Sequence, residues 1–239
     1  MAITRLQTLG SSADRAAEAL RREILSGTIA PGDKLPPERE LAESLGISRL
    51  TLRAGLATLV RDGLVRVRHG SGSYVRDFHE GGGPDLLGDL ADLSLAQIAP
   101  DLLRVRRHLA AAALEAIAER RPGARARRPL ARAVAELARA ADAGVGPDDF
   151  APLDLETARA LVAATGSPAL RLCLNPVIAV VAGSAPLRAA MYADPRANAI
   201  GWRGLLAWVE DPHPAAIPAL LAVLAERDRG TIRRLRGAP

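Results

Sequence analysis

The amino-acid sequence predicts a mainly α-helical protein in which one small β-hairpin interrupts the helices near the N-terminus. Three observations lead to this prediction. The chain is 49% hydrophobic but only 3% aromatic, and its apolar residues are mostly Ala, Leu and Val, which favours helices over a large sheet. Most segments repeat apolar residues every three or four positions, as on one face of a helix. Only residues 64–76 alternate between apolar and polar side chains around a glycine-rich turn.

Three short helices are predicted before this hairpin. The first covers residues 13–26, where apolar residues recur every four positions. After a turn rich in Gly and Pro, the second opens at PPERELAESLG, whose prolines and glutamates suit the first turn of a helix. The third starts at Ser48, a good N-cap, and ends at Gly63.

The order helix, helix, short turn, helix, hairpin is that of a winged helix-turn-helix, a DNA-binding fold. In the third helix, Leu52, Leu56 and Leu59 form the predicted buried stripe. Arg49 and Arg53 lie four residues apart on the opposite side. We therefore expect this helix to enter the DNA major groove, and the hairpin to form the wing that contacts the flanking backbone or the minor groove.

Residues 1–76 are also basic, with 12 Lys and Arg against 8 Asp and Glu, whereas the rest of the chain is nearly neutral. This distribution indicates an anionic partner for the first part only. Arginine can bond to guanine through two donors, and Ser or Thr hydroxyls can bond to phosphate or base. The alternative is a solvated helix face and an ordinary hairpin turn. The expected DNA-contacting residues are Arg39, Ser48, Arg49, Thr51, Arg53, His69 and Gly70.

The segment LPPERELAESLGISRLTLRAGLATLVRDGLVRVRHGSGSYV resembles the DNA-binding domain of the GntR superfamily of bacterial transcription regulators. The resemblance implies DNA contact by the same seven residues. Two positions depart from the family pattern. Leu50 replaces a residue that is usually small or hydroxylic, and we expect it to be able to contact a thymine methyl group. The family segment REAL is here RAGL, residues 53–56, with a helix-weakening glycine.

The part of the chain after the hairpin has a different character. EGGGP has the composition of a linker and is followed by a short amphipathic segment, while every segment beyond Pro100 is helical and bounded by Pro or Gly. We predict a winged helix-turn-helix domain at 1–76 and a linker with a short helix at 77–101. Residues 102–239 are then an all-helical bundle of six or seven helices for effector binding and dimerisation.

The bundle segments LLRVR and LDLETARALVAATGSPAL resemble the FadR branch of the superfamily, whose C-terminal domain encloses an effector pocket. Most members of that branch hold a metal there with an aspartate and three histidines. Asp154 stands at the aspartate position. The three histidine positions fall on Ala158, Trp202 and Val223. We therefore predict no metal site, and we interpret Asp154 as a helix N-cap.

Without those histidines the pocket is predicted to be apolar, which suits a hydrophobic effector better than a small dianion. The stretches VRDFHEGGGPDLLGDLADL, LRLCLNPV and MYADPRANAIGW are similar to fatty-acid-responsive members of this branch. That similarity implies a long-chain acyl-CoA effector and control of fatty-acid metabolism genes. Asn175 either satisfies a bond inside the bundle or meets the ligand, and at least one of the two tryptophans belongs to the core. The expected pocket residues are Arg106, Asn175, Tyr192, Trp202 and Trp208.

These observations predict a cytoplasmic homodimer that binds double-stranded, pseudo-palindromic operator DNA. Cys173 is the only cysteine, which excludes an internal disulfide, and neither a signal peptide nor a membrane span is expected. The sequence has no GxSxG, HExxH or phosphate-loop motif, so neither an enzyme nor a cofactor is expected. Two alternatives stay open: a regulator that responds to a different small metabolite without a metal, and an effector-independent repressor.

Overall fold

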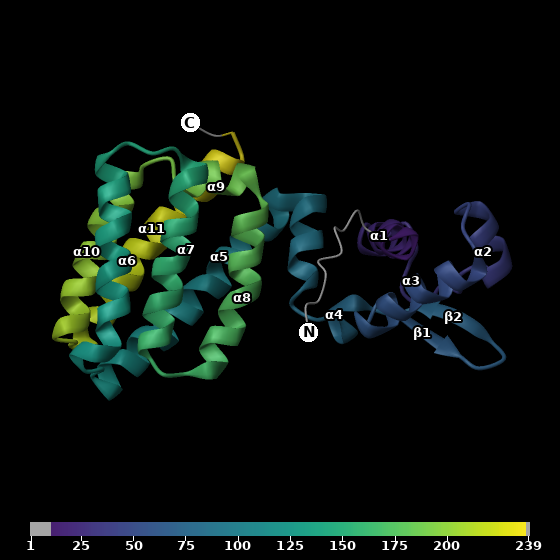
Figure 1. The fold of residues 1–239 in the computed structure, drawn as a ribbon, viewed down its shortest axis with the longest axis horizontal. Helices are drawn as coiled ribbons and strands as arrows, with labels where there is room; N and C mark the ends of the chain where they lie inside the picture. Colours follow the sequence, from purple (N-terminus) through teal and green to yellow (C-terminus); the bar gives the residue numbers. More distant parts are fainter. Residues whose placement is uncertain (1–10, 238–239) are drawn as a thin grey trace, which may run out of the picture. The chain divides into compact units, whose positions relative to one another are not determined.

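The computed structural model describes residues 11–237 of the chain, which are mainly helical with one two-stranded sheet (Figure 1). The predicted fold class is confirmed. The chain divides into two compact units, Met1–Leu93 and Ser94–Pro239, and the division falls inside the predicted linker. Residues 1–10 lie outside the described range, and they make up most of the N-terminal stretch for which no signal peptide is expected. The last two residues of the predicted bundle also lie outside it.

The N-terminal unit has the element order of a winged helix-turn-helix. The two strands of the wing are antiparallel, with Val65 opposite Val75. A single bridge between Lys34 and Tyr74 adds the segment before the second helix to the edge of this hairpin. The elements are α1 (Ser12–Leu25), α2 (Glu38–Ser44), α3 (Arg49–Arg61), β1 (Val65–Arg68), β2 (Gly72–Val75), α4 (Phe78–Gly81) and the first part of α5 (Leu86–Arg120).

Local sequence signals explain where these helices begin. Ser11 and Asp14 form a capping box at the start of α1, in which each side chain bonds to the backbone N–H of the other residue. Ser48 caps α3, as predicted, by accepting from the N–H of Thr51. The prediction for α2 was wrong in detail, because the prolines precede the helix and Pro37 is its N-cap residue.

The core of this unit is the predicted leucine stripe of α3, packed against α1. Leu52, Leu56 and Leu59 are all buried. Gly55 lies where α3 packs on α1, and a Cβ atom there would come within 2.9 Å of the carbonyl oxygen of Ala13. The glycine in RAGL therefore lets α1 pack directly on the backbone of α3, and this explains the departure from the family segment.

The second unit is an all-helical bundle. The α5 backbone leaves helical geometry at Ser94, with φ −154° and ψ 73°, and this residue begins the unit. Among the described residues seven α-helices contribute to the bundle, which agrees with the predicted six or seven. After α5 these are α6 (Ala124–Asp142), α7 (Pro147–Ala164), α8 (Pro168–Gly183), α9 (Ala185–Met191), α10 (Pro195–Glu210) and α11 (Ile217–Leu235), with a short 3-10 turn, η1 (Pro214–Ala216).

Within the bundle, α6 packs against α7 and α10, α7 packs against α8 and α9, and α9 packs against α11 (Figure 1). Buried side chains such as Ile117, Leu130 and Leu161 fill one part of the core, and Val162, Leu174 and other residues fill a second part. Across residues 11–237 no single helix is long and apolar enough to cross a membrane, and only α8 and α9 together, bent by 98°, meet that test.

Candidate nucleic-acid interface and ligand cavity

The first turn of α3 is held in a fixed conformation by its own cap. The Ser48 hydroxyl oxygen accepts from the Thr51 N–H at 3.1 Å and lies 2.8 Å from the Thr51 hydroxyl. Ser48, Arg49 and Leu50 are exposed, and Leu50 keeps 80% of its surface accessible. An apolar side chain this exposed at the start of a helix-turn-helix recognition helix is positioned to contact thymine methyl groups.

Two of the predicted phosphate-binding arginines are paired with carboxylates. Arg53 Nε donates to Glu38 Oε2 at 2.7 Å, and Arg39 Nη1 donates to Glu43 Oε1 at 3.0 Å. Both pairs are solvent-exposed, so each contributes little free energy and can be exchanged for a phosphate. Arg49, by contrast, has no hydrogen bond or ion pair within residues 11–237, and its guanidinium is available to a base.

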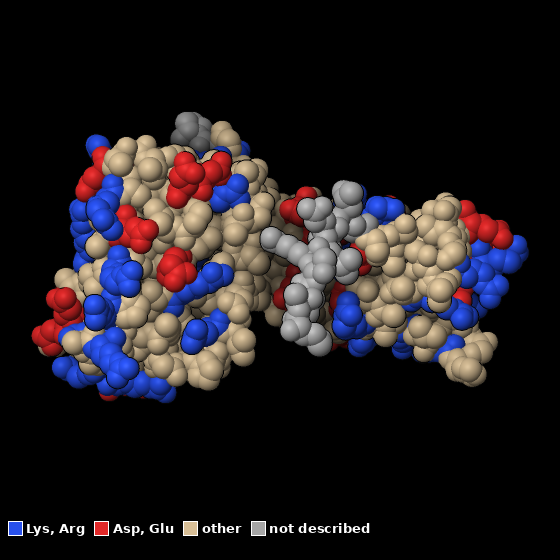
Figure 2. Space-filling view, in the orientation of Figure 1, with Lys and Arg blue, Asp and Glu red and all other residues tan. Residues whose placement is uncertain are grey.

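The wing and the segment that bridges to it carry cations that sequence reasoning missed. His69 and Gly70 are exposed in the turn between β1 and β2, as expected. The Arg68 guanidinium lies 5.2 Å from the centre of the Tyr74 ring, and Lys34 Nζ lies 6.0 Å from it. The outward position of Arg68 in an alternating strand was the available signal. In Figure 2, basic side chains lie beside acidic ones at the end of this unit where Figure 1 places α2.

The helical unit contains a cavity of about 360 Å³. Residues of α5, α7, α8, α9, α10 and α11 line it, together with Tyr192. Most of the lining is apolar, for example Leu161, Leu205 and Leu224. A largely apolar cavity with a few polar groups between the helices of a bundle is typical of a small-molecule binding site.

Asp154 lies at the wall of this cavity, and its interpretation as an N-cap was wrong. The helix begins earlier, at Pro147, so Asp154 lies two turns inside α7 and is buried. Its Oδ2 accepts from the Tyr192 hydroxyl at 3.0 Å, and its Oδ1 accepts from Trp202 Nε1 at 2.6 Å. Burial and the negative charge of Asp154 raise the pKa of Tyr192 well above its usual value, so the tyrosine stays a donor.

The four positions that the resemblance compares with metal ligands all line the cavity: Asp154, Ala158, Trp202 and Val223. At this place Asp154 bonds to an indole and a phenol. No group of three or more His, Cys, Asp or Glu side chains is arranged to hold a metal ion in the part of the chain that the structure describes.

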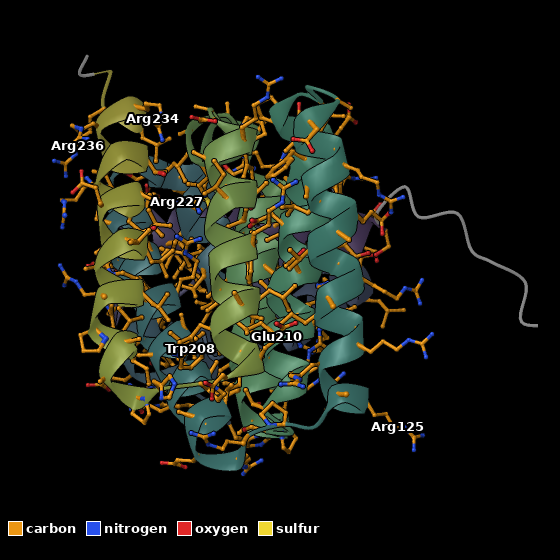
Figure 3. All side chains as sticks on the ribbon, turned by 90° about the vertical axis from the view of Figure 1, so that its left-hand side faces the viewer. Arg125, Trp208, Glu210, Arg227, Arg234 and Arg236 are labelled. Atoms are coloured by element: carbon orange, nitrogen blue, oxygen red, sulfur yellow. The ribbon has the colours of Figure 1, made fainter. Side chains whose placement is uncertain are left out.

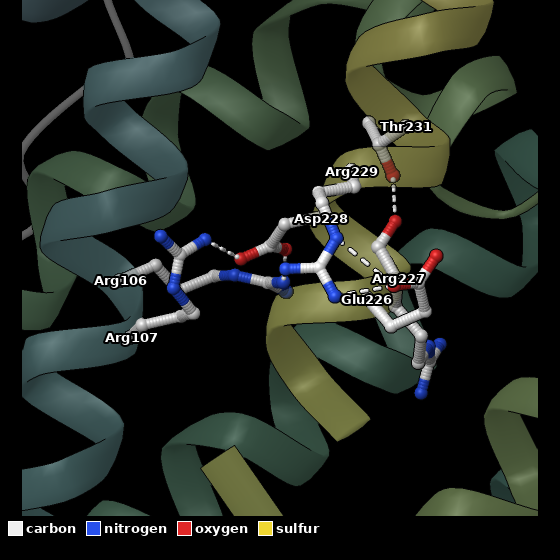
Figure 4. Close-up of polar contacts among 7 residues, drawn as sticks. All are labelled: Arg106, Arg107, Glu226, Arg227, Asp228, Arg229 and Thr231. Atoms are coloured by element: carbon white, nitrogen blue, oxygen red, sulfur yellow. Dashed lines mark hydrogen bonds and ion pairs between the residues drawn. The ribbon is translucent and has the colours of Figure 1, made fainter. Parts of the chain in front are cut away.

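Arg106 lines the cavity from α5 and is paired with α11. Arg106 and Arg107 both donate to Asp228, which is only 1% exposed, and the bond from Arg107 Nη1 is 2.5 Å long (Figure 4). Arg106 Nε is buried without a partner in residues 11–237. Two guanidinium groups therefore share one carboxylate beside the cavity, and the cluster carries excess positive charge.

Three of the five predicted pocket residues line the cavity, and two do not. Arg106, Tyr192 and Trp202 are lining residues. Asn175 is exposed, because the helical period of α8 turns its neighbour Leu174 inward and Asn175 outward, so the expectation that it lies inside the bundle was wrong. Trp208 packs in the core next to the cavity, and its indole donates to the carbonyl oxygen of His213 at 3.1 Å.

The polar lining residues that sequence reasoning missed include Asn198 on α10 and Arg227 on α11. Both interrupt apolar stripes at helical spacing. Asn198 lies four residues before Trp202, and Arg227 lies three after Leu224. A polar residue in an otherwise apolar stripe is the sequence signal that could have identified them.

Comparison with known proteins places this architecture in a family. The description "Bacterial regulatory proteins, gntR family" matches residues 12–75, and "FCD domain" matches residues 101–227. The chain is 38% identical over 171 residues to a "Fatty acid metabolism regulator protein" of Edwardsiella ictaluri, covering 69% of this chain and 67% of that protein. It is 56% identical over 64 residues to an uncharacterized HTH-type transcriptional regulator of Mycobacterium tuberculosis, covering 27% and 26% of the two chains.

A solved structure titled "Lar controls the expression of the Listeria monocytogenes agr system and mediates virulence" covers 99% of this chain and 100% of its own. Its TM-score is 0.59 at 15% sequence identity, which supports the fold alone. The two matched domains coincide with the winged helix-turn-helix and the helical bundle described above. The FCD domain follows the DNA-binding domain in the chain. The chain therefore belongs to the GntR family of bacterial regulatory proteins and is a transcription regulator, not an enzyme.

Proposed function

We propose that this regulator controls genes of fatty-acid metabolism, and that a long-chain acyl-CoA bound in the cavity of the helical unit modulates its affinity for DNA. The observation that carries the proposal is the largely apolar cavity, in which Ala158, Trp202 and Val223 take the places that the resemblance assigns to histidines. The curated relative named as a fatty acid metabolism regulator supports the same physiological role.

The DNA-binding step rests on the N-terminal unit. A cytoplasmic homodimer would place two α3 helices about 34–36 Å apart on a pseudo-palindromic operator, one helical turn of DNA. Arg49 and Leu50 then face base edges, while Arg39 and Arg53 exchange their carboxylate partners for phosphates. The wing tip at His69 and Gly70 lies on the flanking backbone or in the minor groove.

The effector step rests on the cavity. An acyl chain would lie against the apolar walls, with Arg106 Nε, which has no partner in residues 11–237, available to an oxygen of its carbonyl end. Asp154 connects α7 to α10 through Trp202, and to the residue after α9 through Tyr192. Filling the cavity next to these bonds is therefore expected to change how the helices pack. The ligand shifts the protein only by its difference in affinity for the DNA-binding and the released states.

The test is fluorescence anisotropy of a labelled DNA duplex that has been selected for binding to the full chain, at fixed salt because phosphate contacts are salt-dependent. We expect palmitoyl-CoA to weaken DNA binding by about 5-fold or more, in the usual range of allosteric coupling. Free CoA serves as the control and should have no effect. Tight DNA binding that is the same with and without palmitoyl-CoA would overturn the effector proposal.

A further inference from the structure

We propose that the cavity also binds the free fatty acid, whose carboxylate is held directly by Arg227 and Asn198 without a metal ion. This inference rests on the proposed function, because it takes the cavity as the effector site. It goes further by assigning a head-group site and a second form of the effector, a monocarboxylate on an apolar chain.

Asn198 supplies a buried donor that has no acceptor among the described residues. The residue is 3% exposed and lines the cavity from α10. Its Nδ2 is buried and has no hydrogen-bond partner within residues 11–237. A buried amide without an acceptor destabilises the folded protein, so an oxygen atom delivered by a ligand recovers free energy at this position.

Arg227 supplies a cation that forms no ion pair within residues 11–237. It lines the cavity from α11, and Figure 3 shows it between α11 and the neighbouring helices. Its guanidinium makes no hydrogen bond or ion pair among the described residues. The neighbouring Glu226 pairs instead with Arg229 and Arg233, as Figure 4 shows for Arg229. Burial lowers the pKa of Arg227.

Gly201 leaves room for the Arg227 guanidinium beside α10. A Cβ atom at position 201 would lie 3.1 Å from Arg227 Nη1, so the missing side chain is what lets the guanidinium approach α10. Asn198 and Gly201 are three residues apart on that helix and therefore share one side of it. The two unpartnered donors thus reach the same part of the cavity.

The charge around the cavity fits a single negative charge. Arg106, Arg107 and Arg227 face two carboxylates, those of Asp154 and Asp228. The Asp228 carboxylate takes two of the arginines, and the Asp154 oxygens already accept from Tyr192 and Trp202. One positive charge is left over. A carboxylate balances that charge and can accept from an arginine and an amide together, whereas a neutral ester leaves the cation unpaired.

Isothermal titration calorimetry of the full chain with palmitate and with palmitoyl-CoA tests the inference. We expect wild-type protein to bind palmitate, and Arg227→Gln to weaken that binding about 10- to 100-fold, as expected for the loss of a charge-assisted bond. Arg236→Gln is the matched control, because it removes the same charge from an exposed position outside the cavity (Figure 3). It should change the affinity less than 2-fold.

The possible failures are distinguishable. Equal palmitate binding by the wild-type and the Arg227→Gln protein overturns the carboxylate site. Binding of palmitoyl-CoA without binding of palmitate also overturns that site, but it leaves the proposed function intact. Failure of both ligands to bind overturns the proposed function as well. Arg227→Gln removes an unpaired, half-buried charge, so we expect the thermal midpoint of this variant to equal or exceed that of the wild type. That result would establish that the variant loses palmitate binding without losing its fold. Gly201→Ala should weaken palmitate binding without changing any charge.

Discussion

Replacing Trp202 by Phe removes one of the two hydrogen bonds that hold the buried carboxylate of Asp154. The Trp202 Nε1 atom lies 2.6 Å from Asp154 Oδ1, and Asp154 is only 6% exposed, so water has little access to the oxygen that loses its donor. A hydrogen bond to a charged acceptor contributes about 1.5–3 kcal/mol. We expect Trp202→Phe to lower the free energy of unfolding by about 2–3 kcal/mol, once the smaller ring is included.

Urea unfolding of the full chain, followed by circular dichroism, measures this loss. Trp208→Phe is the matched control, since it deletes the same atoms but breaks a bond to a neutral carbonyl, that of His213, in an exposed setting. Its cost should be about 1 kcal/mol. If Trp202→Phe is no more destabilising than Trp208→Phe, then the bond to Asp154 does not hold the bundle together as we infer.

Three further predictions concern other parts of the molecule. Arg49→Ala should cost about 1–3 kcal/mol of DNA-binding free energy and relax one base position, measured by anisotropy on selected duplexes; unchanged affinity and base preference would exclude this contact. Gly55→Ala should lower the free energy of unfolding by about 1 kcal/mol, since the clash with Ala13 outweighs the gain in helix propensity, and a higher thermal midpoint would contradict this. Asp228→Ala removes a buried carboxylate and leaves two half-buried arginines without their partner, so it should cost about 3–5 kcal/mol in the same unfolding experiment; a loss below about 1 kcal/mol would refute the pairing.

The winged helix-turn-helix could be predicted from the sequence because each of its signals is local. The Ser48 cap, the leucine stripe of α3 and the alternating strands each lie within a few residues of the structure that they specify. The helical bundle was predictable as a class for the same reason, since its helices are separated by Pro and Gly.

The cavity was less predictable because its polar contacts are long-range. The donors to Asp154 come from residues 38 and 48 positions further along the chain, so nothing near Asp154 indicates its role. Asn175 looked buried because its neighbours in the sequence are apolar, but the helical period of α8 places it outside. Arg227 is charged, and only its position in the apolar stripe of α11 indicates that it faces inward.

The most direct test of the coupling between cavity and DNA compares the affinity of palmitoyl-CoA for the free protein with its affinity for protein saturated with selected DNA. Linkage requires that DNA weaken palmitoyl-CoA binding by the same factor by which palmitoyl-CoA weakens DNA binding. We predict two equal factors of about 5-fold or more. Equal palmitoyl-CoA affinity for free and DNA-bound protein would contradict the proposal that the acyl ligand releases this regulator from DNA.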